Sequence, residues 1–278
     1  HVQGVLLNGG VPPVHVDDVA EPLEGEEGDT GNSDASGDKV DLHLPKVQEE
    51  LIEKVTAVGK PTIVVLMAGS AIDLNYAQDN CNGILLAWYP GAGGGRAIAD
   101  LLFGKESPSG KLPITFYKDL EGMPEFTDYS MKNRTYRYME KEALYPFGYG
   151  LTYSDTCVTE AEVVGEVSAE SDIVLKATVK NNGTVDTDEV VQVYIKDLDS
   201  PLAVRNYSLC GFKRVSLKAG EEKSVEFTIS NKAMNIVDED GNRYIAGKHF
   251  RLFAGVSQPD TRSAELTGHK PAEVEIAL

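Results

Sequence analysis

The sequence predicts an α/β domain followed by an all-β sandwich, and two patterns along the chain support this fold class. Up to about residue 117, apolar runs of helical period alternate with short continuous apolar runs that are typical of buried strands. After about residue 158, short strand-like runs follow one another, separated by turn sequences rich in Asn, Asp and Gly. We therefore expect an α/β domain with a mainly parallel sheet over residues 1–117, a connector over 118–157, and an Ig-like sandwich over 158–278.

The elements of the first domain follow one another from residue 44. Pro45 fits the first turn of a helix, and apolar residues recur at helical spacing from Val47 to Val58, before Gly59 ends the helix. The β-branched run Thr62–Met67 predicts a strand that is covered on both faces. The next predicted elements are a short helix over 71–78, a strand over 83–88, a helix over 96–103 and a strand over 112–116. This helix–strand alternation favours a parallel sheet with helices on its faces.

The connector is rich in Tyr and Phe, whereas a free linker would be polar. We expect its rings to pack on the surface of a domain. Beyond about residue 154 no helix is expected, and the strand candidates cover 173–179, 190–195, 211–217, 224–229 and 249–253. Seven or so short strands at this spacing are typical of an Ig-like or fibronectin-III-like sandwich.

Composition excludes several classes of partner and site. The formal net charge of −18 would repel a polyanionic nucleic acid or an anionic membrane, and no apolar run approaches the roughly 18 residues that span a bilayer. We expect a soluble protein without nucleic-acid or membrane partners, and the sequence leaves open whether it is cytoplasmic or secreted. Cys81, Cys157 and Cys210 fit neither a disulfide framework nor a zinc site, so we expect ordinary thiols, no metal and no cofactor.

The glycine-rich segment Pro90–Gly95 follows a predicted strand and precedes a predicted helix, as a phosphate-binding loop would. It lacks the Gly-Lys-Ser/Thr ending of a P-loop and the G-x-G-x-x-G spacing of a dinucleotide site. We interpret it as a tight turn that uses glycines at positive φ, with nucleotide binding as the weaker alternative.

The acidic segment Glu21–Asp29 is the first candidate for a catalytic role. It contains Glu24, Glu26 and Glu27 between glycines, which would let the backbone project a carboxyl group into a cleft as a general acid/base. The alternatives are a solvated loop or a weak calcium loop, although the spacing is not that of an EF-hand.

A series of further motifs runs in unbroken order over roughly residues 21–260. The motifs are Leu23–Glu27, Ser36–Lys39, Gly59–Pro61, Ala87–Gly91, Ala97–Gly104, Pro108–Phe116, Arg134–Tyr138, Leu144–Tyr153, Val179–Val191 and Leu209–Leu217. Together they resemble the C-terminal part of glycoside hydrolase family 3, a group that contains many β-glucosidases and β-xylosidases, with its fibronectin-III-like domain.

This resemblance implies retaining hydrolysis of β-linked oligosaccharides or glycosides. In the family, an Asp of an N-terminal (β/α)8 barrel attacks the anomeric carbon, and a Glu of the second domain protonates the leaving oxygen and then activates water. Matching the motifs implies that Glu26 is this acid/base, with Glu27 and Glu24 as the alternatives. The two carboxyl groups must lie about 5–5.5 Å apart, so the loop must reach over the barrel.

No eightfold βα pattern is present in these 278 residues. We therefore expect the barrel to be missing and to be contributed in cis or in trans, whether the chain is a fragment or a subunit, and we expect the isolated chain to be inactive. The choice between glucosides and xylosides depends chiefly on that barrel. The alternative function is a non-catalytic carbohydrate-binding or interaction module.

Three other side chains are candidates for sugar contacts. Arg134 and Arg137 suit salt bridges that dock the connector better than contacts with sugar hydroxyls. Trp88, at the end of a predicted strand, is interpreted as a packing residue, with stacking on a sugar as the alternative.

Overall fold

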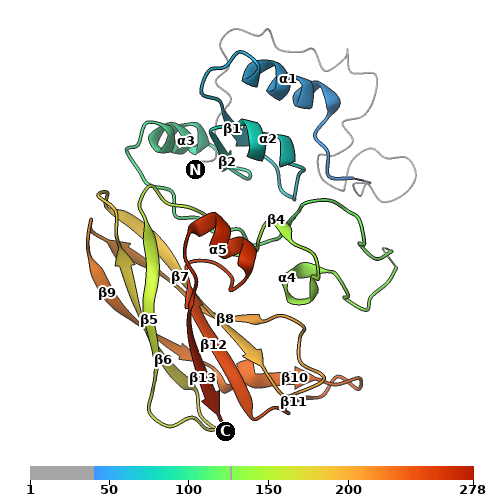
Figure 1. The fold of residues 1–278 in the computed structure, drawn as a ribbon, viewed down its shortest axis with the longest axis vertical. Helices are drawn as coiled ribbons and strands as arrows, with labels where there is room; N and C mark the ends of the chain where they lie inside the picture. The colour runs from blue at the N-terminus through green and yellow to red at the C-terminus, as the bar shows by residue number, and fades with distance from the viewer. Residues whose placement is uncertain (1–40, 126) are drawn as a thin grey trace. The chain divides into compact units, whose positions relative to one another are not determined.

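The computed structural model describes residues 41–125 and 127–278, and these form two compact units (Figure 1). The first unit holds residues 41–106 and 116–121, and the second holds residues 107–115 and 122–278. The acidic segment with Glu24, Glu26 and Glu27 lies outside the described residues. The predicted boundaries at residues 117 and 157 stay predictions.

The first unit is built as helix and strand in alternation. Its elements are α1 (Lys46–Thr56), β1 (Ile63–Leu66), α2 (Asn75–Asn80), β2 (Gly83–Leu86), α3 (Gly94–Leu102) and β3 (Phe116–Tyr117). β1 and β2 pair in parallel, from Ile63 opposite Gly83 to Leu66 opposite Leu86. Val64, Leu66 and Ile84 of these strands are buried. The continuous apolar runs therefore form buried parallel strands, as their composition predicts.

The prediction of a mainly parallel sheet is not confirmed, because among the described residues only β1 and β2 form such a pair in this unit. The strand predicted over 112–116 is wrong except at Phe116. Leu112 belongs to the second unit, where its N–H donates to the Tyr149 carbonyl and its carbonyl accepts from the Gly148 N–H. Pro113, which has no N–H, cannot continue a strand ladder.

The glycine-rich segment is a tight strand-to-helix turn, as predicted. Gly91 has φ +63°, which only glycine adopts at no steric cost, and its carbonyl accepts from the Gly94 N–H at 3.1 Å. A Cβ atom on Gly94 would overlap the Cβ and Cγ atoms of Pro90, whereas one on Gly95 would meet open space. The turn is thus closed by the contact between Pro90 and the first residue of α3.

Gly94→Ala is expected to lower the free energy of unfolding of the first unit by about 1–3 kcal/mol, because the Pro90 ring must move. Gly95→Ala is the matched control in the same helix, and it should stabilise by about 0.5–1 kcal/mol through helix propensity. Urea unfolding followed by the fluorescence of Trp88, the single tryptophan, measures both. Equal effects of the two substitutions would contradict the assigned role of the turn.

The second unit contains a β-sandwich, and neighbouring strands within each of its two sheets pair antiparallel (Figure 1). One sheet has the order β5-β6-β9, with β5 (Thr156–Val164), β6 (Ile173–Asn181) and β9 (Glu222–Ile229). The other has the order β13-β12-β7-β8, with β13 (Ala272–Ala277), β12 (His249–Gly255), β7 (Thr187–Asp197) and β8 (Ser208–Leu217). In β6 buried and half-buried residues alternate strictly, which places one face in the core. The predicted all-β sandwich is confirmed.

Smaller elements surround the sandwich. They are α4 (Thr135–Tyr138), β4 (Ala143–Tyr145), the 3₁₀ helix η2 (Asn231–Met234), the hairpin β10 (Asn235–Val237) and β11 (Arg243–Ile245), and α5 (Thr261–Thr267). The expectation of no helix in this part of the chain is therefore wrong. Asp260 caps the start of α5 by accepting from the Ser263 N–H, and Gly268 ends it at φ +78°.

The connector packs on the sandwich through aromatic rings, as its composition predicts. Tyr136 stacks on Phe147 with ring centroids 4.2 Å apart, and both rings lie edge-on to Tyr194 of β7. Tyr194 is fully buried, and its ring centroid lies 5.5 Å from that of Tyr207. Such rings remove large apolar areas from water, so the connector is held as part of the second unit.

Candidate active-site region

The edge of the first unit where β1 and β2 end is the strongest candidate surface among the described residues. Because the strands are parallel, residues that follow both of them leave from the same edge, and ligands of open α/β sheets bind at this edge. The ladder continues one step beyond the strands, since the Ala87 N–H donates to the Leu66 carbonyl at 2.8 Å. This edge, made of residues 67–70 and 87–91, is called the carboxyl edge below.

The carboxyl edge carries strain and exposed apolar side chains. Trp88 has φ +52°, which is unfavourable for a bulky residue, and its side chain is half-buried. Met67 and Tyr89 are 61% and 62% exposed. The half-buried indole fits the packing interpretation of Trp88 in part only, because a residue that merely fills a core has no need of a strained backbone.

Ser70 adds an unpaired polar atom to the same edge. Its Oγ is buried and makes no hydrogen bond with any described residue. Most buried hydroxyls in proteins are paired, and an unpaired one costs about 1–3 kcal/mol. The hydroxyl is thus available, as donor and acceptor, to a group outside the residues that the structure describes.

The two arginines weighed as sugar contacts lie in the second unit. The Arg134 Nη2 donates to the carbonyl of Glu125 at 2.7 Å and more weakly to that of Pro124 at 3.4 Å, so this side chain braces the loop before it. Arg137 contributes its backbone, whose carbonyl accepts from the Asn206 N–H at 3.0 Å. Both acceptors are backbone carbonyls of the connector itself, so the role of Arg134 in docking the connector through salt bridges stays a prediction.

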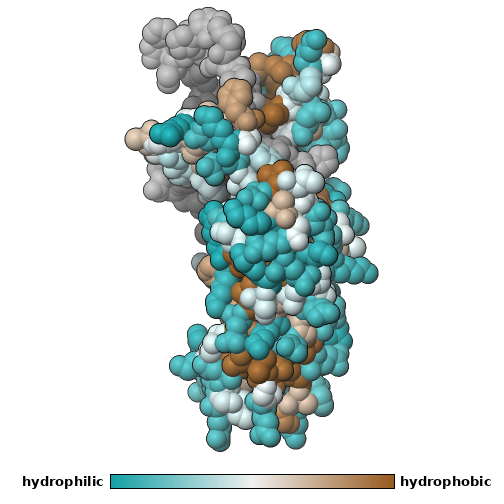
Figure 2. Space-filling view, turned by 90° about the vertical axis from the view of Figure 1, so that its left-hand side faces the viewer, coloured by the Kyte–Doolittle hydropathy of each residue, from teal (hydrophilic) through white to brown (hydrophobic). Residues whose placement is uncertain are grey.

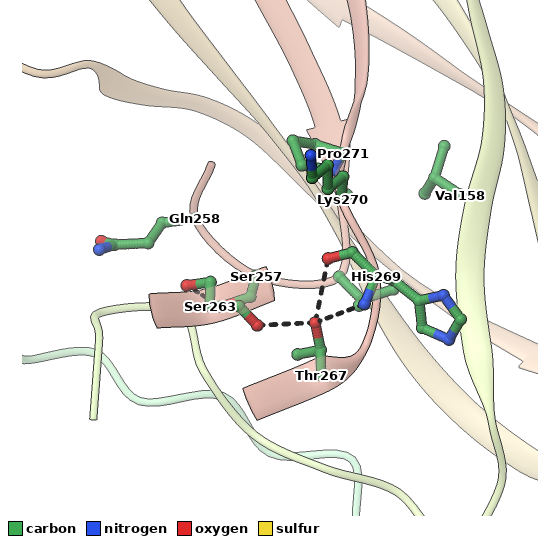
Figure 3. Close-up of a pocket in the computed structure, with 10 residues that line it drawn as sticks. Val158, Ser257, Gln258, Ser263, Thr267, His269, Lys270 and Pro271 are labelled. Atoms are coloured by element: carbon green, nitrogen blue, oxygen red, sulfur yellow. Dashed lines mark hydrogen bonds between the residues drawn. The ribbon is translucent and has the colours of Figure 1, made fainter. Parts of the chain in front are cut away.

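A small pocket lies between the end of β12 and α5 in the second unit (Figure 3). Ser257, Ser263, Thr267 and His269 line it, and Thr267 Oγ1 bonds the carbonyls of Ser263 and His269. Its volume of about 10 Å³ holds a single water molecule. A sugar ring does not fit, so this pocket is not a substrate site.

Hydrophilic side chains cover most of the coloured face in Figure 2, and several apolar areas lie between them. Within the part of the chain that the structure describes, no three His, Cys, Asp or Glu side chains gather as metal ligands, and no helix is long and apolar enough to cross a bilayer. The three cysteines are free thiols, and burial raises the pKa of Cys210 to about 12.

One buried charge pair was not expected from the sequence. Lys111, from the Pro108–Phe116 motif, places its Nζ 2.8 Å from Glu189 Oε1 of β7, and the two side chains are 8% and 2% exposed. Thr156 Oγ1 and the Val190 N–H also donate to this carboxylate, each at 2.6 Å. Lys111 stands between Gly110 and Leu112, and its partner lies 78 positions further along the chain, so no local pattern identifies the pair.

Family models match most of the chain. The model described as the glycosyl hydrolase family 3 C-terminal domain matches residues 14–153, which is half of the chain. The chain belongs to glycosyl hydrolase family 3. The model of the fibronectin type III-like domain matches residues 189–258, within the sandwich of this family 3 chain.

Relatives of this family 3 chain include a xylan 1,4-β-xylosidase of Xylanibacter ruminicola, 38% identical over 270 residues, and a periplasmic β-glucosidase of Salmonella typhimurium, 31% identical over 252 residues. These alignments cover 96% and 86% of this chain but 30% and 33% of the relatives. Among solved structures, a β-glucosidase of Bifidobacterium adolescentis matches 88% of this chain and 37% of its own with a TM-score of 0.75 at 30% identity. The chain spans about a third of the length of the curated relatives it matches.

Proposed function

We propose that this chain is the C-terminal region of a retaining β-glycosidase and contributes the general acid/base for hydrolysis of terminal non-reducing β-D-glycosides. The observation that carries the proposal is the family 3 match over residues 14–153, because this range includes the acidic segment Glu21–Asp29. The relatives named above act, by their names, on β-xylosides and β-glucosides. A glycosidase needs two carboxyl groups at the scissile bond, and this segment offers one of them.

The acid/base is assigned to Glu26, with Glu24 and Glu27 as the alternatives. In the first step Glu26 gives its proton to the leaving oxygen while an Asp of the (β/α)8 barrel forms a bond to the anomeric carbon. In the second step the Glu26 carboxylate takes a proton from water, whose oxygen displaces the Asp. Both steps require a carboxyl–carboxyl distance of about 5–5.5 Å, so the barrel must lie against this segment, in cis or in trans.

The substrate is a neutral β-glycoside, and two sugars remain candidates. The β-glucosidase relative at 31% identity supports a β-glucoside, whereas the xylosidase relative at 38% identity supports a β-xyloside. Glucose carries a hydroxymethyl group that xylose lacks. The pocket around the non-reducing sugar must either accommodate this group or exclude it. That pocket belongs mainly to the barrel, so this chain does not determine whether the enzyme prefers a glucoside or a xyloside.

The proposal is tested by restoring the missing portion. A chimera carries the N-terminal portion of the X. ruminicola xylosidase followed by this chain in place of the matched 270 residues. We expect 4-nitrophenyl β-D-xyloside or β-D-glucoside to be hydrolysed by the chimera and not by the chain alone. Hydrolysis by the isolated chain that Glu26→Gln abolishes would contradict the requirement for a barrel. A folded but inactive chimera, with saturable sugar binding by the chain alone, would instead support a binding module.

A further inference from the structure

We propose that Lys213 and Lys223 close the open edges of the β-sandwich and keep those edges from pairing with a second copy of this chain. Each lysine belongs to one sheet, and its Nζ donates to a backbone carbonyl of the other sheet. The inference concerns the second unit alone and does not depend on the proposed glycosidase function.

The edges in question belong to β8 and β9. β8 ends the sheet with the order β13-β12-β7-β8, and β9 ends the sheet with the order β5-β6-β9. The turn at residues 218–221 joins the two strands, so their edges lie close together. An edge strand presents a row of N–H and C=O groups to which a strand of another chain can bond. β8 also exposes 67% of Phe212, so pairing at this edge would bury apolar surface as well.

The ladder between β6 and β9 shows which backbone groups of β9 face its open edge. The Asn181 N–H donates to the Glu221 carbonyl at 2.9 Å, just before the first paired residue of β9. Residues of an antiparallel strand alternate between bonding the neighbouring strand and facing away from it, and this register runs on without a shift. Ser224 and Glu226 therefore direct their N–H and C=O groups away from β6, toward the open edge.

The two lysines occupy acceptors on these end strands. Lys213 of β8 donates to the Glu226 carbonyl of β9, and its ammonium group lies 5.6 Å from the centre of the Phe227 ring. In the opposite direction, Lys223 of β9 donates to the Ser216 carbonyl of β8 at 2.6 Å. Each ammonium group takes a carbonyl and places a charge where an added strand would lie. Burying that charge would cost free energy, so strand addition is disfavoured.

A second copy of this chain is the partner that fits these edges once the lysines are removed. Arg214 of β8 and Glu222 and Glu226 of β9 are exposed, so the β8 edge of one copy and the β9 edge of another carry opposite charges. Removing the two lysines adds two negative charges to a chain of net charge −18, which by itself opposes association. Self-association of such a variant would therefore report the opened edges rather than a loss of repulsion.

The test variant carries Lys213→Ala with Lys223→Ala, and the matched control carries Lys218→Ala with Lys232→Ala. Both have the same composition and net charge. Lys218 and Lys232 are exposed lysines of the second unit, and Lys218 bonds the side chain of Asp186 instead of a strand carbonyl. In sedimentation velocity, we expect the test variant of the 278-residue chain to associate at concentrations roughly tenfold or more below those that the control needs.

Two further readouts locate the contact. Hydrogen exchange at the Ser224 and Glu226 amides, which face the open edge, should slow as the test variant associates. Lys213→Arg with Lys223→Arg keeps a donor at each position and should sediment as the unsubstituted chain does. A double-alanine variant that stays folded by circular dichroism and sediments as its control would overturn the proposal. Association that leaves both amides exchanging at their original rates would overturn it too.

A milder variant covers the case in which the double-alanine chain unfolds. Lys223→Ala alone leaves Lys213 in place over the Phe227 ring and opens only the β8 edge. Its control is Lys218→Ala, and the same sedimentation comparison applies. Stronger self-association of Lys223→Ala would support the proposal, and identical sedimentation of the two single variants would overturn it.

Discussion

Lys111→Met is expected to lower the free energy of unfolding of the second unit by about 3–5 kcal/mol. The substitution leaves the Glu189 carboxylate 2% exposed and without its cation. The bonds from Thr156 and Val190 remain, but they do not neutralise the charge. Lys111 also donates to the Gly150 carbonyl at 2.6 Å, so the tie between segment 107–115 and the connector is lost too.

Urea unfolding followed by circular dichroism measures this effect. Lys218→Met is the matched control, because Lys218 lies 2.8 Å from Asp186 but the two side chains are 78% and 57% exposed. We expect the control to leave the urea midpoint nearly unchanged, because exposed ion pairs contribute little to stability. Removing both buried charges, with Lys111→Met and Glu189→Leu, should recover most of the loss. A loss below about 1 kcal/mol in the single variant would show that water reaches this pair.

Glu26→Gln in the chimera is expected to lower kcat for β-glycosides with poor leaving groups by about 10²–10⁴-fold. Glutamine retains the size of the side chain but neither donates a proton to the leaving oxygen nor accepts one from water. Glu24→Gln and Glu27→Gln are matched controls within the same segment and should each lower kcat by less than tenfold, that is by less than about 1.4 kcal/mol of barrier. If Glu24→Gln or Glu27→Gln instead lowered kcat strongly while the Glu26→Gln chimera stayed active, the acid/base would be the glutamate replaced in the inactive variant.

The fold of this chain is predicted well where the signals are local. The helical period around α1, the β-branched run of β1 and the alternation in β6 each appear in the sequence as they appear in the structure. The helix α5 was missed although its Asp260 cap and Gly268 stop are present, because its seven residues are too few to show a period. The strand predicted over 112–116 failed because its hydrogen bonds go to residues 148 and 149.

Features of the candidate site depend on what the fold brings together, so they could not be predicted in the same way. Trp88 was predicted to end a strand over 83–88, whereas β2 ends at Leu86, and the positive φ of Trp88 belongs to the turn that follows. The missing partner of the Ser70 hydroxyl is a property of the surrounding packing and has no signal in the sequence. The assignment of Glu26 rests on the family motif, because a carboxyl group acts as a general acid only in an environment that tunes it.

Leaving-group dependence in the Glu26→Gln chimera tests most directly whether this chain carries the acid/base. The 2,4-dinitrophenolate group leaves without being protonated. The Glu26→Gln chimera should therefore form the glycosyl-enzyme nearly as fast as the chimera that retains Glu26, while hydrolysis of the glycosyl-enzyme stays slow. Added azide, which attacks without a base, should then restore turnover and give the β-glycosyl azide. Equal losses on both leaving groups, with no azide product, would show that Glu26 is not the acid/base.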